Sequence, residues 1–271
     1  MLEIDTSGAR SKVTYLVLLM SFYKTATAGL ALSVISALTI SAPSALAVAE
    51  SEIEAGLPDI DTIRTLAKNN VGQAYVSSLK AQADKLRDYR CMCRLFTRKN
   101  NVWKDYGGAD YSYKFRGLFK AVIKSKDYRN GSIVVREPNG VIRGAGGGAL
   151  SFMKITMKED SRTLQLPTGY SLANSDFSSL FGILSSSIAS GATLATSATA
   201  LNLKLFSEPV TMVVLKTSSA ADSPISEVFF IGNESKLPIG WHTFQKGIPH
   251  AVVLFQNFEP NKGLTADSFS L

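Results

Sequence analysis

Residues 111–124, with the sequence YSYKFRGLFKAVIK, are the stretch that decides the fold. Apolar and basic residues alternate along this stretch. The odd positions carry the apolar series Tyr111, Tyr113, Phe115, Phe119, Ala121 and Ile123, and the even positions carry the basic series Lys114, Arg116, Lys120 and Lys124. Successive side chains of a strand point to opposite faces, so this pattern predicts one long β-strand with an apolar and a basic face. Gly117, within the apolar series, predicts a bend. A long, bent, one-sided strand predicts a curved antiparallel sheet whose apolar face needs a cover.

Most of the remaining chain predicts further strands of this sheet. Alternating or continuous apolar runs predict strands at 89–98, 132–137, 151–158, 210–216, 227–231, 239–245 and 251–258. The last run, AVVLFQNF, is apolar on both faces in its middle, as is typical of a central, covered strand. Turns are predicted at 105–108 (DYGG) and 138–140 (PNG). We therefore expect residues 48–271 to form a single, mainly β domain.

Two helical stretches are candidates for the cover. Residues 58–86 have an apolar helical face that Gly72 interrupts, and residues 177–188 carry an apolar stripe behind a cap at Asn174 or Ser175. The uncharged segment 185–200 is predicted to be either a mobile loop with a weak helix or a movable flap over the apolar face. The glycine-rich segment 143–148 lacks the Lys-Ser/Thr ending of a phosphate-binding loop, so it predicts a flexible loop at the mouth of the sheet.

The first 47 residues have the features of an export signal. Basic residues precede the apolar run 28–40, and Ala45-Leu46-Ala47 places small residues at the positions that a signal peptidase needs. Met20 is an alternative start to Met1. An uncleaved anchor is the alternative to a cleaved signal, but Thr, Ser and Pro interrupt the run short of the roughly 20 apolar residues of a membrane span. We expect residues 1–47 to be a signal peptide and the protein to be exported to the periplasm or cell envelope.

Charge and cysteine content narrow the possible partners. The chain has a formal net charge of +7, and its basic residues are concentrated in 85–143, which suits an anionic surface or an acidic partner, with an ordinary solvated face as the alternative. No nucleic-acid motif occurs, and nucleic acid is not expected for an exported protein. The two cysteines, Cys91 and Cys93, would face the same way on one strand. We interpret them as small buried apolar residues, with a local disulfide as the alternative.

The sequence has few of the residues and motifs that are typical of an enzyme. Its two histidines, His242 and His250, are predicted on neighbouring strands, but pairing across Gly247 would place His242 opposite Val253 rather than His250. Neither G-x-S-x-G nor H-E-x-x-H occurs. A hydrolase whose triad residues are dispersed in sequence is the alternative. We expect no catalysis, no metal and no cofactor.

Several motifs resemble a known family. These are Leu237-Pro238-Ile239, the segment 255–261 (FQNFEPN), the closing Asp267-Ser268-Phe269 and the basic-apolar Lys114-Phe115-Arg116. Together they resemble the lipoprotein-carrier superfamily, the LolA/LolB-like proteins. Residues 134–148, Thr168-Gly169-Tyr170 and Ser175-Asp176-Phe177 resemble an uncharacterised bacterial branch of secreted domains related to it (a domain of unknown function). The resemblance covers about residues 57–271.

The resemblance implies an open, curved antiparallel β half-barrel with helices covering its concave apolar face. It implies a lipid, an acyl chain or a lipoprotein as ligand, and a carrier as one possible role. The buried arginine that holds the lid of the classical carrier closed has no assignable counterpart here. The predicted cavity residues are Cys91, Cys93, Tyr113, Phe115, Phe119, Met153, Ile155, Met157, Met212, Phe230, Trp241 and Phe255. The alternative function is an envelope regulatory domain that binds a membrane protein partner. The basic face of Arg90, Arg94, Lys114, Arg116, Lys120 and Lys124 would suit that partner or an anionic membrane surface.

Overall fold

The computed structural model describes residues 48–125, 129–220 and 222–271, which lie in a compact unit spanning residues 46–271. The predicted signal peptide, residues 1–47, lies outside the described residues. The strands are β1 (Ala67–Val71), β2 (Asp88–Lys99), β3 (Val102–Lys114), β4 (Leu118–Lys124), β5 (Ile133–Arg136), β6 (Ile142–Ala145), β7 (Lys154–Met157), β8 (Thr193–Ser197), β9 (Val210–Lys216), β10 (Ile225–Gly232), β11 (Pro238–Gln245) and β12 (Ile248–Pro260). The helices are α1 (Glu50–Gly56), α2 (Ile60–Leu66), α3 (Gln73–Ala83) and α4 (Phe177–Ala189), with 3₁₀ turns η1 (Gly148–Leu150), η2 (Arg162–Leu164), η3 (Leu172–Asn174) and η4 (Ala266–Phe269).

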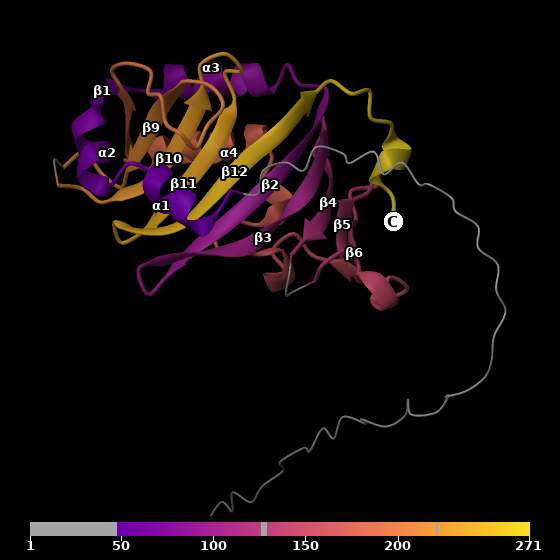
Figure 1. Ribbon diagram of the computed structural model, residues 1–271. Helices are drawn as coiled ribbons and strands as arrows, with labels where there is room; N and C mark the ends of the chain where they lie inside the picture. Colours follow the sequence, from indigo (N-terminus) through magenta and orange to yellow (C-terminus); the bar gives the residue numbers. More distant parts are fainter. Residues whose placement is uncertain (1–47, 126–128, 221) are drawn as a thin grey trace, which may run out of the picture. The chain divides into compact units, whose positions relative to one another are not determined.

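The twelve strands of the described residues form one antiparallel sheet (Figure 1). Their order is β1-β8-β9-β10-β11-β12-β2-β3-β4-β5-β6-β7, so β1 and β7 are the two edges and the sheet stays open. Its longest pairing joins β2 to β3, from Asp88 opposite Lys114 to Lys99 opposite Val102. The fold is the predicted open, curved antiparallel half-barrel with helices on its concave apolar face.

The stretch 111–124 is a hairpin, so the prediction of one long strand was wrong. β3 ends at Lys114, which pairs with Leu118 of β4, and Tyr113 pairs with Phe119. The chain reverses at Arg116 and Gly117, whose φ angles are 79° and 80°. Side chains that pair across a hairpin share a face. Because the turn has three residues, the odd-numbered residues of both strands lie on the same face, and the even-numbered residues lie on the other. The two predicted faces are therefore real, although they belong to two strands.

The reversal between β2 and β3 also differs from prediction. Residues 105–108 were predicted as a turn but lie inside β3, whereas the chain turns at Asn100 and Asn101, with φ of 51° and 61°. Asparagine tolerates positive φ better than most residues. Gly108 instead permits close pairing, because a Cβ there would lie 2.1 Å from the carbonyl oxygen of Cys93.

Three short strands, β1, β6 and β8, were missed by the sequence analysis. The predicted helix 58–86 is divided into α2 and α3 by β1, with Gly72 immediately before α3. The segment 185–200 is not the predicted loop, since it completes α4 and then forms the largely buried strand β8. β8 pairs with β1 on one side and β9 on the other. Of the predicted loop 143–148, residues 143–145 belong to β6.

Helices cover both faces of the sheet. α3 and α4 lie over the concave, inner face, where they share one hydrophobic cluster with strands from β2 to β12. α1 and α2 cover parts of the opposite, outer face, and Figure 1 shows them on the near side with α4 behind the strands. Within the described ranges, no helix is long and apolar enough to cross a membrane.

Candidate site: the apolar inner face beneath helix α4

Helix α4 has one apolar face and no charged residue. Its N-cap is Asp176, whose side chain accepts a hydrogen bond from the Ser179 amide, rather than the predicted Asn174 or Ser175. The face turned to the sheet is the predicted stripe, which buries Phe177, Leu180, Phe181 and Leu184. The stripe fills the inner face, so the predicted cavity is occupied by side chains of the helix itself.

Among the described residues, the groups of α4 that form hydrogen bonds to neighbouring elements are uncharged. Ser178 Oγ donates to Asp84 Oδ1 at 2.8 Å, and Gln73 Nε2 of α3 donates to Ser185 Oγ at 2.7 Å. The Phe177 amide donates to the Tyr89 hydroxyl at 3.4 Å. By contrast, α1 is tied to the outer face by ion pairs of Glu54 with Arg98 and of Glu50 with Lys104. The attachment of α4 is therefore mostly apolar.

Aromatic rings from three neighbouring strands form the floor beneath α4. Tyr89 of β2 stacks on Tyr113 of β3 and on Phe177 of α4, each with ring centroids 5.0 Å apart. Tyr111 stacks on Phe119 of β4 at 6.2 Å, and its buried hydroxyl has no hydrogen-bond partner among the described residues. Burial raises the pKa of Tyr113 to about 12 and raises the pKa of Tyr89 and Tyr111 as well. These rings are thus neutral, large apolar surfaces.

A buried carboxyl group lies within this apolar region. Glu227 of β10 accepts hydrogen bonds from the Tyr170 hydroxyl and, at 2.9 Å, from Trp241 Nε1. Burial raises the pKa of Glu227, and the two hydrogen bonds oppose that shift. The network fastens the loop that carries Tyr170 to the floor of the site. Sequence analysis missed Glu227, although it shares the alternation of Phe229 and Ile231 and could have been identified from it.

The structure brings only some of the predicted cavity residues together. Those in the inner hydrophobic cluster are Cys91, Tyr113, Phe119, Met157, Trp241 and Phe255, with Cys93 packed against its margin. Their role in binding stays a prediction. Phe115, Met153 and Ile155 are about half exposed, Phe115 because it lies in the hairpin turn.

Met212 and Phe230 do not lie with the others, so placing them in the same cavity was wrong. Both belong to the cluster beneath α2 on the outer face. Phe229 pairs with Trp241 on the inner face, and the next residue along β10 necessarily points the other way. Strands that are apolar on both sides gave the sequence analysis no means of choosing between the two faces.

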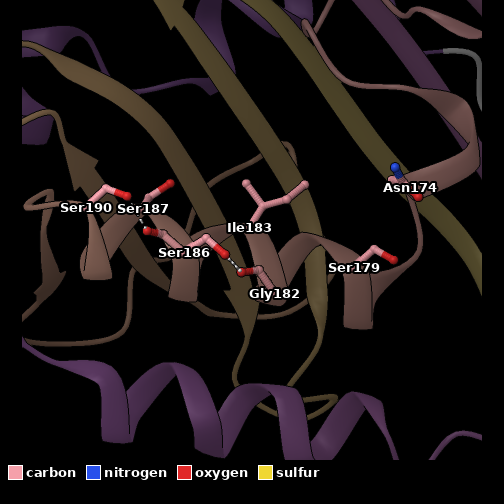
Figure 2. A pocket seen from close by; sticks show the side chains of 7 residues that line it. All are labelled: Asn174, Ser179, Gly182, Ile183, Ser186, Ser187 and Ser190. Atoms are coloured by element: carbon pink, nitrogen blue, oxygen red, sulfur yellow. Dashed lines mark hydrogen bonds between the residues drawn. The ribbon is translucent and has the colours of Figure 1, made fainter. Parts of the chain in front are cut away.

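Two hollows adjoin α4. A cleft of about 470 Å³ lies at its C-terminal end, where Ile188 and Ala192 meet Val71 of β1 and Leu194 of β8. All but Leu194 are partly buried residues at the margin of the inner cluster, and Leu194 belongs to the cluster. The second hollow, of about 570 Å³, runs along the side of α4 that is turned away from the sheet (Figure 2). There Ser186 Oγ donates to the Gly182 carbonyl at 3.1 Å and Ser190 Oγ to the Ser186 carbonyl at 2.9 Å, so these hydroxyl protons are already used.

The predicted basic face is partly occupied by the chain's own C-terminal segment. Lys114 donates to the Leu264 carbonyl at 2.7 Å and Lys120 to the Ser270 carbonyl at 3.0 Å. Lys124 pairs with Asp110, and Arg94 pairs with Asp105. Leu264 and Phe269 bury themselves against Val135 beside these lysines. Arg90, Arg116 and the paired Lys124 remain exposed, so about half of the predicted face is accessible.

The histidines and cysteines lie apart from any catalytic arrangement. His242 is buried against Trp103 and Phe244 and pairs with Val252 rather than the predicted Val253. Burial lowers its pKa to about 3. His250 is partly exposed and bonds to Gln245. The free thiols of Cys91 and Cys93 lie 3.7 Å apart. No group of three metal-ligating side chains occurs in the part of the chain that the structure describes.

No family model matches the chain, and no curated protein matches it. Among solved structures, it is similar to a DUF1329 family protein from Desulfovibrio piger at 11% identity, covering 73% of this chain and 95% of that one, with a TM-score of 0.39. It is similar to MucB at 13% identity, covering 73% of this chain and 62% of MucB, with a TM-score of 0.44. It is similar to a LolA superfamily protein from Nitrosomonas europaea at 9% identity, covering 72% and 97%, with a TM-score of 0.33. The superfamily that the sequence motifs resemble is thus among the matched structures, and likenesses of this degree concern the fold alone.

Proposed function

We propose that this protein is an exported, non-catalytic binding protein that holds an acyl chain of a lipid or lipoprotein on its inner face beneath α4. The observation that supports the proposal is the pairing of an apolar inner face with a helical cover, α4, that packs on it mainly through apolar side chains. α4 itself contributes only apolar side chains and uncharged hydrogen-bonding groups to its attachment, one of which, the Ser178 hydroxyl, donates to the Asp84 carboxylate. A bound acyl chain would replace those apolar contacts with equivalent ones, at little net cost in buried apolar surface.

The cleft at the C-terminal end of α4 is the proposed entrance. The apolar part of its lining continues into the inner cluster through Leu194 and Ile188, and the rest of the lining includes the polar Asn70, Thr193, Lys216 and Ser219. An acyl chain that starts there would displace the stripe of α4 progressively, from Ile188 towards Phe177. The helix ends at Ala189, and its C-cap Ser190 is followed by Gly191 with φ of 98°, which provides a reversal at the edge of this cleft.

Binding of a fluorescent fatty acid tests the proposal, with two variants of the same helix. Ile188 lines the cleft, whereas Ile183 lines the second hollow, on the side of α4 that is turned away from the sheet (Figure 2). A carboxylate on the acyl path must be desolvated, so Ile188→Asp should weaken binding by about tenfold or more, and the matched Ile183→Asp should not.

The lipids that co-purify with the protein provide the second measurement. Mass spectrometry should find acyl-containing molecules with the wild-type protein and fewer with Ile188→Asp. A protein that binds no fatty acid and co-purifies with no lipid would overturn the proposal. Recovery of a single stable protein partner instead would favour the regulatory interaction domain.

A further inference from the structure

Four large apolar side chains are exposed together at one edge of the sheet. They belong to the sequence LSFMKI, where Leu150 is 54%, Phe152 77%, Met153 50% and Ile155 51% exposed. The other large exposed apolar residues of the described chain lie singly, at Val102, Tyr106, Phe115 and Ile248. Isolated exposed apolar residues are ordinary, whereas a group of them in one segment marks an interaction surface.

The segment projects from the sheet in a defined conformation. It spans η1 and the start of β7, the last strand of the sheet, and Figure 1 shows the rose-coloured coil beyond β6. Its amides bond within the turn, from Leu150 to the Gly147 carbonyl at 3.1 Å and from Met153 to the Leu150 carbonyl at 2.9 Å. Gly147 is held against the neighbouring turn, where a Cβ would lie 1.9 Å from the Asn130 carbonyl oxygen. The exposed side chains are therefore presented by an ordered turn.

The charge of the segment is positive. Residues 150–158 contain Lys154 and Lys158 and no acidic residue. Lys154 donates to the carbonyl oxygen of Leu271 at 3.5 Å, and neither lysine forms an ion pair with a described carboxylate side chain. Glu159, the nearest acidic residue that follows, is paired with Arg136 at 2.7 Å. Apolar side chains beside lysines match the acyl boundary and the anionic headgroups of a bilayer.

A second copy of this chain fits the segment less well. Strand addition needs a long, regular edge, but β7 has four residues and begins with Lys154, features that disfavour pairing between edges. Three of the four apolar residues lie on the turn before the strand rather than on it.

We propose that residues 150–155 are a membrane-docking turn that inserts its apolar side chains into the surface of an anionic lipid bilayer. This inference is independent of whether an acyl chain binds beneath α4.

A tryptophan placed on the turn tests the inference in the full chain. The native Trp103 and Trp241 are 3% and 1% exposed, so a tryptophan introduced by Phe152→Trp would be the solvent-exposed emitter. The matched control is Ile248→Trp, at an isolated residue that is 62% exposed. With vesicles containing phosphatidylglycerol, the emission of the Phe152→Trp variant should shift to the blue and be quenched by brominated acyl chains, and that of Ile248→Trp should not change.

Flotation with the same vesicles gives the second readout and separates docking from the uptake of single lipids, because uptake leaves the protein unattached. Leu150→Ser/Phe152→Ser should lower the vesicle partition coefficient by about tenfold or more. Lys154→Glu/Lys158→Glu should lower it for phosphatidylglycerol vesicles and not for phosphatidylcholine vesicles. Three results would overturn the inference: unchanged emission at position 152, an equal shift at position 248, or a concentration-dependent shift without vesicles, which would indicate a second copy.

Discussion

Truncating Phe181 should make the protein less stable and, at the same time, a better binder of acyl chains. Phe181 is fully buried under α4, on the stripe that the proposed ligand displaces. Removing a buried phenyl group costs about 3–5 kcal/mol of unfolding free energy. If ligand binding requires α4 to leave the inner face, the same change makes that displacement easier. Weakening the closed state by about 3 kcal/mol could raise the apparent affinity by up to about 150-fold, and we expect at least about tenfold.

The control for Phe181→Ala is Phe230→Ala. Phe230 is also fully buried, but it lies in the cluster beneath α2 on the outer face. Its truncation removes the same atoms and should cost a similar free energy of unfolding without changing the affinity for an acyl chain. Because a loss of about 3–5 kcal/mol is large against a total stability of about 5–15 kcal/mol, Phe181→Leu provides a milder second variant.

Denaturant unfolding and titration with a fluorescent fatty acid measure the two effects. Tighter binding in Phe181→Ala and unchanged binding in Phe230→Ala would support displacement of α4. Equal affinities in the wild type and both variants, at equal losses of stability, would refute it. The stripe of α4 would then be permanent core, and any ligand would have to bind elsewhere.

Three further predictions concern buried polar groups. Burial raises the pKa of Glu227 in the folded protein, so its contribution to stability is present below its ordinary pKa of 4.5 and is lost as the pH rises through the folded value. The unfolding free energy of the wild type should therefore fall over that pH window, and that of Glu227→Gln should change less. The pKa of His242 is lowered from 6.5 to about 3, so its contribution to stability is present above pH 6.5 and lost as the pH falls towards 3. His242→Leu should remove up to about 5 kcal/mol of that acid dependence, and equal acid dependence in both proteins would contradict this. Asp176→Ala removes the cap of α4 and should cost about 1–2 kcal/mol while tightening acyl-chain binding, whereas Asp59→Ala, which removes the cap of α2, should cost stability without that gain.

The sequence predicted the sheet well where one face is buried and the other exposed or charged. Alternation identified β2 and the two faces of 111–124, and the period of the stripe identified α4. The turn at Arg116 and Gly117 was not predicted, because a hairpin keeps paired residues on one face. The alternation of apolar and basic residues is therefore the same for this hairpin as for one long strand.

The remaining errors also have physical causes. β1 (AKNNV) and β8 (TLATS) are short and polar, and each is a strand through its pairing rather than through its own propensity. In β9 and β10 both faces are buried, so no pattern could separate Phe230 from Phe229. The network of Glu227 depends on a contact with Tyr170, 57 residues away in sequence, which no local pattern records.

Photoaffinity labelling with a fatty acid that carries a diazirine near its terminal carbon tests the central claim most directly. If an acyl chain lies beneath α4, the labelled peptides should contain inner-face residues such as Tyr89, Phe177 and Phe255. Excess unlabelled fatty acid should compete for this labelling. Labelling confined to the outer-face cluster around Met212, or spread over the surface without competition, would contradict the account.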